Sequence, residues 1–154
     1  MAIWLFYHHT ESGPGETALN LLPRALAQGW RVALRCGPGD RAAWWDQRLW
    51  LGPEDGFLPH GIAGGAHDDR QPVLIGPEVS GQGRQALVLT DGTTATADEA
   101  AGLERVWVLF DGADPAAVDG ARALWRQAQA GGQGLQYWAE TAGRWEKKQE
   151  RAAG

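Results

Sequence analysis

Short, largely apolar runs recur along the chain and predict the strands of a buried sheet. The clearest runs, rich in β-branched and aromatic side chains, are residues 3–8, 31–36 and 105–110. Shorter candidates are residues 73–75, 86–90 and 134–139. Strands that are apolar at most positions, rather than at alternate ones, are typical of a sheet covered on both faces.

Apolar residues between these runs recur at helical spacing and predict the helices that cover the sheet. The helical segments are residues 17–28, 40–49, 97–103 and 115–130. In the first helix, Pro23 removes a backbone donor and predicts either a kink or a late start. Before the last, Asp114 and Pro115 have the residue types of an N-cap and a first helical position. The alternation predicts an α/β fold in three layers, a largely parallel sheet with helices on both faces.

Two segments show no usable periodicity. Residues 51–72 are rich in Gly, Pro, Asp and His and predict a long loop, which in a small domain is usually functional or mobile. Residues 144–151 are highly charged and predict a solvated, fraying helix end. With no repeat, low-complexity block or linker, we expect one α/β domain over residues 1–142 and a charged C-terminal tail over 143–154.

Composition narrows the class of protein. The 154 residues carry a formal net charge of −5, which argues against a protein that mainly coats phosphate backbones. No apolar run approaches the length of a membrane span, and the N-terminus lacks the features of a signal peptide. The single cysteine, Cys36, permits neither an internal disulfide nor a Cys-based zinc site. We therefore expect a cytoplasmic protein with no membrane contact.

Aromatic usage is unusual, with nine Trp against two Tyr and three Phe. Tryptophan concentrates in cores and at the anchor points of protein interfaces.

The sequence contains little that indicates nucleotide or metal chemistry. The glycines after the first strand, at 13 and 15, form neither a dinucleotide fingerprint nor a phosphate-binding loop, and Glu11 and Glu16 beside them would repel phosphate. His60 and the His67-Asp68-Asp69 segment contain metal-ligand residue types, but their spacing matches no metal signature, and ordinary solvated loop residues explain them better. We expect no cofactor and no metal.

Candidate nucleophiles and acid–base groups also have simpler explanations. Ser12 and Ser80 lie outside a nucleophile-elbow motif, and Cys36 suits a small buried apolar residue better than a reactive thiolate. Asp111 and Asp114 follow a strand, as acid–base groups often do in α/β enzymes, although helix capping alone accounts for Asp114. These residues therefore give little reason to expect an active site in this chain.

One constellation on the last helix stands out. Arg122, Trp125 and Arg126 are spaced i, i+3 and i+4 and share one helix face. Guanidinium groups beside an aromatic anchor suit a ligand that combines an apolar group with carboxylates. The alternative is that Trp125 belongs to the core and the two arginines are ordinary surface residues.

Together with other segments, these residues resemble the chi subunit of the bacterial DNA polymerase III holoenzyme, a clamp-loader accessory subunit. The most specific segment is Leu49-Trp50 followed by Phe57-Leu58-Pro59-His60-Gly61. The other matching segments, in order, are Phe6-Tyr7-His8, Gly29-Trp30-Arg31-Val32, Cys36, Pro72-Val73-Leu74-Ile75, Phe110-Asp111, Ala121-Arg122, Trp125-Arg126 and Gly134-Leu135.

The resemblance implies a Rossmann-like, non-catalytic subunit without a nucleotide site. It implies that the chain links the clamp loader to single-stranded DNA-binding protein (SSB) by binding the acidic, Pro-Phe-terminated C-terminal tail of SSB, and meets DNA only indirectly. By the same resemblance the tail-binding residues are Trp50, Phe57, Arg122, Trp125 and Arg126, the last two replacing a commoner Tyr-Lys pair. A psi-type subunit is a further implied partner, whose binding surface the sequence does not locate.

Two other functions remain open from the residues alone. The tryptophans could act as stacking platforms of a direct single-strand nucleic-acid binder, against which the net charge counts. Alternatively, Asp111 and the His60 segment could form the site of a small α/β hydrolase or nucleotide-binding enzyme.

Overall fold

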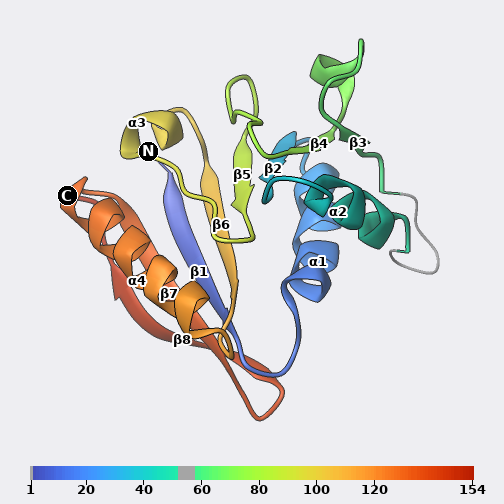
Figure 1. Ribbon diagram of the computed structural model, residues 1–154. Coiled ribbons are helices and arrows are strands. Elements are labelled where there is room, and N and C mark those ends of the chain that lie inside the picture. The colour runs from blue at the N-terminus through green and yellow to red at the C-terminus, as the bar shows by residue number, and fades with distance from the viewer. Residues whose placement is uncertain (1, 52–57) are drawn as a thin grey trace.

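The strands form one eight-stranded sheet in a computed structural model that describes residues 2–51 and 58–154 (Figure 1). Across the sheet their order is β3-β4-β2-β5-β6-β1-β7-β8, and only β8 runs antiparallel to its neighbour. The strands are β1 (Ile3–His9), β2 (Val32–Arg35), β3 (Gly61–Ile62), β4 (Val73–Gly76), β5 (Ala86–Leu89), β6 (Arg105–Asp111), β7 (Gly134–Thr141) and β8 (Arg144–Arg151). The helices are α1 (Pro14–Ala27), α2 (Arg41–Trp50), the 3-10 turn η1 (Asp68–Arg70), α3 (Ala97–Ala100) and α4 (Pro115–Ala130).

Each face of the sheet has its own apolar core, because successive side chains of a strand point to opposite faces. In β1, Trp4 and Phe6 join the core beneath α3 and α4, whereas Leu5 and Tyr7 pack with the core beneath α1 and α2. Figure 1 shows α4 and the pair α1 and α2 on opposite sides of the sheet. The predicted α/β class, a largely parallel sheet with helices packed on it, is therefore confirmed.

Most predicted elements form within a few residues of their expected bounds. α4 has its predicted cap: the Asp114 carboxylate accepts a hydrogen bond from the Ala116 N–H at 3.0 Å. Cys36 is fully buried, as expected for a small apolar residue. The late start predicted for the first helix is wrong, because α1 begins at Pro14 and includes Pro23 in its interior. Proline suits a first helical position, where its missing N–H has no partner to lose.

The stretch predicted as one long loop, residues 51–72, contains ordered structure in its described part. The two-residue strand β3 pairs with β4, and the Ala63 N–H extends the pairing by donating to the Ile75 carbonyl at 2.8 Å. The buried Arg84 guanidinium donates to the carbonyls of Asp68 (2.9 Å) and Gln71 (2.7 Å) and so fixes the returning chain. A two-residue edge strand is too short to produce a sequence period, and for that reason the pattern missed it.

The helix end predicted for residues 144–151 is also wrong. These residues form strand β8, which pairs with β7 through a two-residue turn at Ala142 and Gly143. Both turn residues have positive φ, 52° and 76°, as the type I′ turns that suit tight hairpins require. β8 therefore belongs to the sheet rather than to a separate tail.

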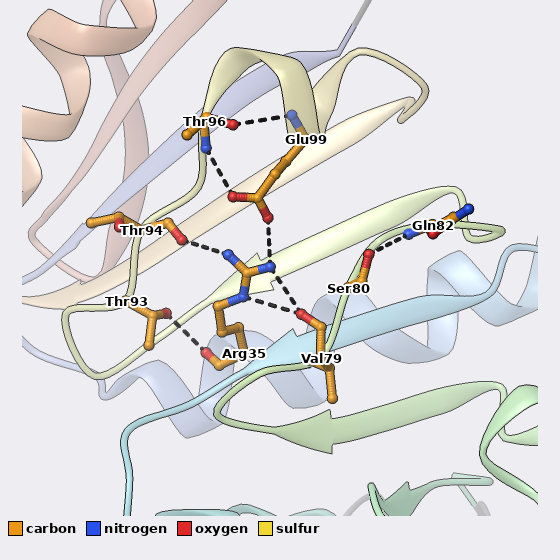
Figure 2. A network of polar contacts seen from close by, with 8 residues as sticks. All are labelled: Arg35, Val79, Ser80, Gln82, Thr93, Thr94, Thr96 and Glu99. Carbon is orange, nitrogen blue, oxygen red and sulfur yellow. Dashed lines mark hydrogen bonds and ion pairs between the residues drawn. The ribbon is translucent and has the colours of Figure 1, made fainter.

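A polar network holds the chain over the α3–α4 face (Figure 2). Arg35, at the end of β2, donates to the carbonyls of Val79 (2.9 Å) and Thr94 (2.6 Å) and pairs with Glu99 at 2.7 Å. Glu99 also completes a capping box with Thr96 at the start of α3. One side chain thus ties β2 to both connections that cross this face.

Candidate functional site

The two arginines of the sequence constellation lie exposed on α4. Ala121, Leu124 and Ala128 turn inward and anchor the helix to the core over β1, β6 and β7. Arg122 and Arg126, one turn apart, point outward, and neither has an ion pair within residues 2–51 and 58–154. A pair of unpaired guanidinium groups one turn apart is a surface to which a carboxylate can bind.

Trp125 belongs mainly to the core. It is 9% exposed, and its ring packs edge-on against Phe6 at 5.2 Å and against Tyr137 at 5.8 Å between centroids. The burial of these three side chains therefore agrees with the alternative interpretation, a core tryptophan between surface arginines. Most of the Trp125 ring therefore packs against the core beneath the α4 surface, and little of it contacts solvent.

A histidine–aromatic cluster lies beside Arg122 and is formed by side chains of β1, β6 and β7. His8 Nδ1 and the Tyr137 hydroxyl are 2.8 Å apart, and the His8 ring lies 5.0 Å from that of Phe110. Burial and the nearby positive charge of Arg122 both lower the pKa of His8. Burial raises the pKa of the Tyr137 hydroxyl, against a smaller opposing effect of Arg122. The site thus places an arginine, an imidazole and a phenol at one edge of α4.

Gly112 makes this cluster possible. A Cβ at this position would overlap the His8 ring and the carbonyl of His9, and the Gly112 N–H already donates to that carbonyl at 2.7 Å. Any side chain here would displace His8 from the site.

Sequence reasoning missed His8 and Tyr137 as members of this surface. They come together because β7 pairs beside β1, with Phe6 opposite Tyr137, and the strand order cannot be read from local pattern. The available signal was that both residues fall within predicted strands.

Of the four described residues expected to bind the SSB tail, Trp50 lies apart from the other three. Trp50 is the last residue of α2, on the opposite face of the sheet from α4, and it is 59% exposed. Its ring lies 5.2 Å from that of His60. Phe57 lies outside the described residues. Among the described ones, Arg122, Trp125 and Arg126 share the α4 surface.

The groups considered for metal or acid–base chemistry have structural partners. His60 lies 2.6 Å from the Leu58 carbonyl and 3.1 Å from the Asp46 carboxylate, and the Asp68 carboxylate accepts from two backbone N–H groups of the preceding turn. Asp111 accepts from the Ala113 N–H at 2.8 Å. No group of three or more potential metal ligands occurs among the described residues.

The turn after β1, where an α/β nucleotide-binding protein holds phosphate, is filled by the chain's own carboxylate. Glu140 of β7 accepts from the N–H groups of Thr10, Glu11 and Ser12 at 3.0–3.2 Å and from the Ser12 hydroxyl at 2.9 Å. Burial raises the pKa of Glu140, but these donors outweigh it and hold the pKa below its usual value. The backbone donors that would bind a phosphate are thus already used.

The fold and the site together define an α/β protein with two exposed arginines on α4. In the turn after β1, where related folds bind phosphate, the Glu140 carboxylate takes up the backbone donors. Within the described part of the chain, no helix has the length and apolar character needed to cross a membrane. The sequence matches the family described as DNA polymerase III chi subunit, HolC, over residues 1–136. No curated protein matches it. The chain belongs to the DNA polymerase III chi subunit family, which makes it a non-catalytic accessory subunit for replication.

Proposed function

We propose that the α4 surface binds the acidic C-terminal tail of SSB, and that the chain thereby links SSB to the clamp loader. Arg122 and Arg126 pair with tail carboxylates, including the terminal one. The apolar end of the tail packs against the surface formed by His8, Tyr137 and Trp125.

The observation that supports this most is the position of Arg122. Its guanidinium has no ion pair in the described residues, and it stands beside an aromatic floor in which His8 and Tyr137 offer further polar atoms. Arginine binds a carboxylate through two parallel hydrogen bonds, and an aromatic surface beside it accommodates a phenylalanine ring. A peptide that ends in an aromatic residue with a free carboxylate combines both features.

A linking subunit needs a second surface, and the opposite face offers one. Trp50, Leu51 and Ile62 are among the few large apolar side chains exposed in the described residues, and all lie where α2 ends beside β3. Exposed apolar side chains gathered at one edge are typical of protein interfaces. We assign this α2–β3 edge, Trp50, Leu51 and Ile62, to the clamp-loader side, directly or through a psi-type subunit.

Calorimetry with a synthetic tail peptide tests the α4 site. Arg122→Ala is expected to weaken binding roughly tenfold to a hundredfold, because one charge-assisted contact contributes about 1.5–3 kcal/mol. Thermal stability should barely change, since Arg122 is exposed. Higher salt should weaken the wild type more than the variant.

Two matched controls accompany this test. Arg70→Ala removes another exposed arginine, on η1 far from α4, and should leave the affinity unchanged. Amidating the peptide's terminal carboxylate should reproduce much of the Arg122→Ala loss, and deleting the final Phe should cost at least as much. If the wild type and Arg122→Ala bound the intact, amidated and truncated peptides with equal affinity, α4 would not be the binding surface.

A further inference from the structure

Another surface on the face opposite α4, distinct from the α2–β3 edge, combines aromatic rings with positive charge. α1 packs over β2 and β6, and the β7–β8 hairpin extends the sheet past it. Between helix and hairpin runs a groove of about 200 Å³. It is lined by Tyr7, Thr17, Asn20, Leu21, Arg24, Trp138 and Trp145.

Three partly exposed aromatic rings form the floor of this groove. Tyr7 and Trp138 are opposite each other in the β1–β7 register. Trp145, on β8, meets the Tyr7 ring edge-on at 5.2 Å between centroids. The Trp138 indole N–H donates to Gln136 at 3.0 Å, so its polar atom is satisfied. All three rings are half-buried, neither enclosed in the core nor free in solvent.

The charges around the groove are mainly positive. Arg24 is exposed and makes no ion pair among the described residues, and Lys147 stands opposite Trp138 in the β7–β8 register. The nearby acids are already engaged: Glu140 by the turn after β1, and Glu150 by Lys147 at 3.1 Å. Glu16, two turns before Arg24 on α1, does not line the groove. Strand β8 itself carries four basic and two acidic residues.

We propose that this groove binds single-stranded nucleic acid. Bases stack on Trp138 and Trp145, while a phosphate lies at Arg24, whose guanidinium makes no ion pair among the described residues. Aromatic platforms beside cations are the means by which proteins hold single strands without reading their sequence, since every base offers a ring face. Trp138, Trp145 and Lys147 lie beyond residue 136, where the match to the family ends, so the proposal stands independently of it. It adds a direct contact to a chain expected to meet DNA only through SSB.

Fluorescence anisotropy with labelled oligothymidylate of about twelve nucleotides tests the proposal on the whole chain at low salt. The wild type should bind, and binding should weaken steeply as salt is raised, because phosphate contacts release counterions. Trp138→Ala should weaken binding roughly fivefold to a hundredfold, the range expected for loss of one stacking platform. Arg24→Glu, on the exposed side of α1, should weaken it at least as much.

The control is Arg122→Glu, which makes the same charge change on the opposite face. It should leave the oligonucleotide affinity within about twofold of the wild type while abolishing binding of the SSB-tail peptide. Arg24→Glu and Trp138→Ala should keep full peptide affinity, which also shows that both variants fold. The experiment can therefore contradict the oligonucleotide groove and the SSB-tail site on α4 independently of each other.

Three outcomes would overturn the proposal. The first is no oligonucleotide binding by the wild type even at low salt. The second is binding that neither Arg24→Glu nor Trp138→Ala weakens. The third is that a proline-rich peptide, the other ligand suited to aromatic grooves, binds there and the oligonucleotide does not compete.

Discussion

At the scale of single residues, two adjacent histidines illustrate how strand alternation separates roles. His8 points to the α4 surface and contacts Tyr137, whereas His9 points to α1, where its Nε2 lies 2.6 Å from the Thr17 hydroxyl. His9 Nδ1 lies 2.9 Å from the Phe110 carbonyl, and the side chain is almost fully buried. The sequence shows only a His-His pair; the period of two assigns one ring to a surface and the other to the core.

His9 predicts how stability depends on pH. Burial lowers its pKa below the ordinary 6.5, although the Phe110 carbonyl and Glu140 partly oppose the shift. As pH falls below about 6.5, the unfolded chain takes up the proton before the folded one. This contribution to the free energy of unfolding is therefore complete above that pH and is lost on acidification.

Denaturant unfolding at pH 7.5 and 5.5 measures this loss. His9→Gln should show a smaller decrease in stability between the two pH values than the wild type, whatever its absolute stability. His67→Gln, at an exposed position, should keep the wild-type decrease. An unchanged decrease in His9→Gln would assign the acid sensitivity to other groups.

At the scale of elements, the β7–β8 hairpin depends on its turn. Ala142 has φ of 52°, in the left-handed region that alanine adopts at a cost and asparagine tolerates. The following Gly143 also has positive φ, so Asn-Gly would give the preferred type I′ turn. Ala142→Asn should stabilise the protein by about 1 kcal/mol.

Thermal or denaturant unfolding checks this, with Ala142→Val as the matched variant. A β-branched residue is poorly suited to positive φ, so Val should destabilise where Asn stabilises. Both variants should leave binding of the tail peptide unchanged, because neither turn residue belongs to the proposed α4 surface. Destabilisation by Asn would show that the turn adopts another conformation.

The elements also show what the sequence could and could not predict. Buried strands such as β6 and the capped helix α4 have continuous apolar runs or capping residues, and both were predicted closely. β8 has one apolar residue among eight, because as an edge strand it faces solvent, and its charges resemble a helix end. Its only local signal was the Ala-Gly turn. The shared face of Arg122, Trp125 and Arg126 was predicted, because spacing along one helix defines a face. Their neighbours His8 and Tyr137 were not, because contacts across strands depend on sheet order.

At the scale of the whole molecule, the sheet separates the proposed partner surfaces. α4 carries Arg122 on one face, and the α2–β3 edge carries Trp50, Leu51 and Ile62 at the opposite end of the strand order. The two proposed surfaces share no residue, so we expect both partners to bind at once. Such an arrangement suits a subunit that connects two assemblies better than one that alternates between them.

This separation predicts independent effects of single substitutions. Ile62→Asp, at a 43%-exposed position, places a charge in the apolar edge and should weaken association with the purified clamp-loader complex at least tenfold. It should leave the SSB-tail affinity within about twofold, because distant sites without shared contacts contribute additively. Arg122→Ala should do the reverse, and the double variant should lose both interactions by the sum of the separate free-energy changes.

Binding measured for each partner in the presence and absence of the other completes the test: saturating tail peptide should not displace the clamp-loader complex. Competition between the two partners, or a loss of both interactions from either single substitution, would mean that they share one surface and that the chain cannot connect them.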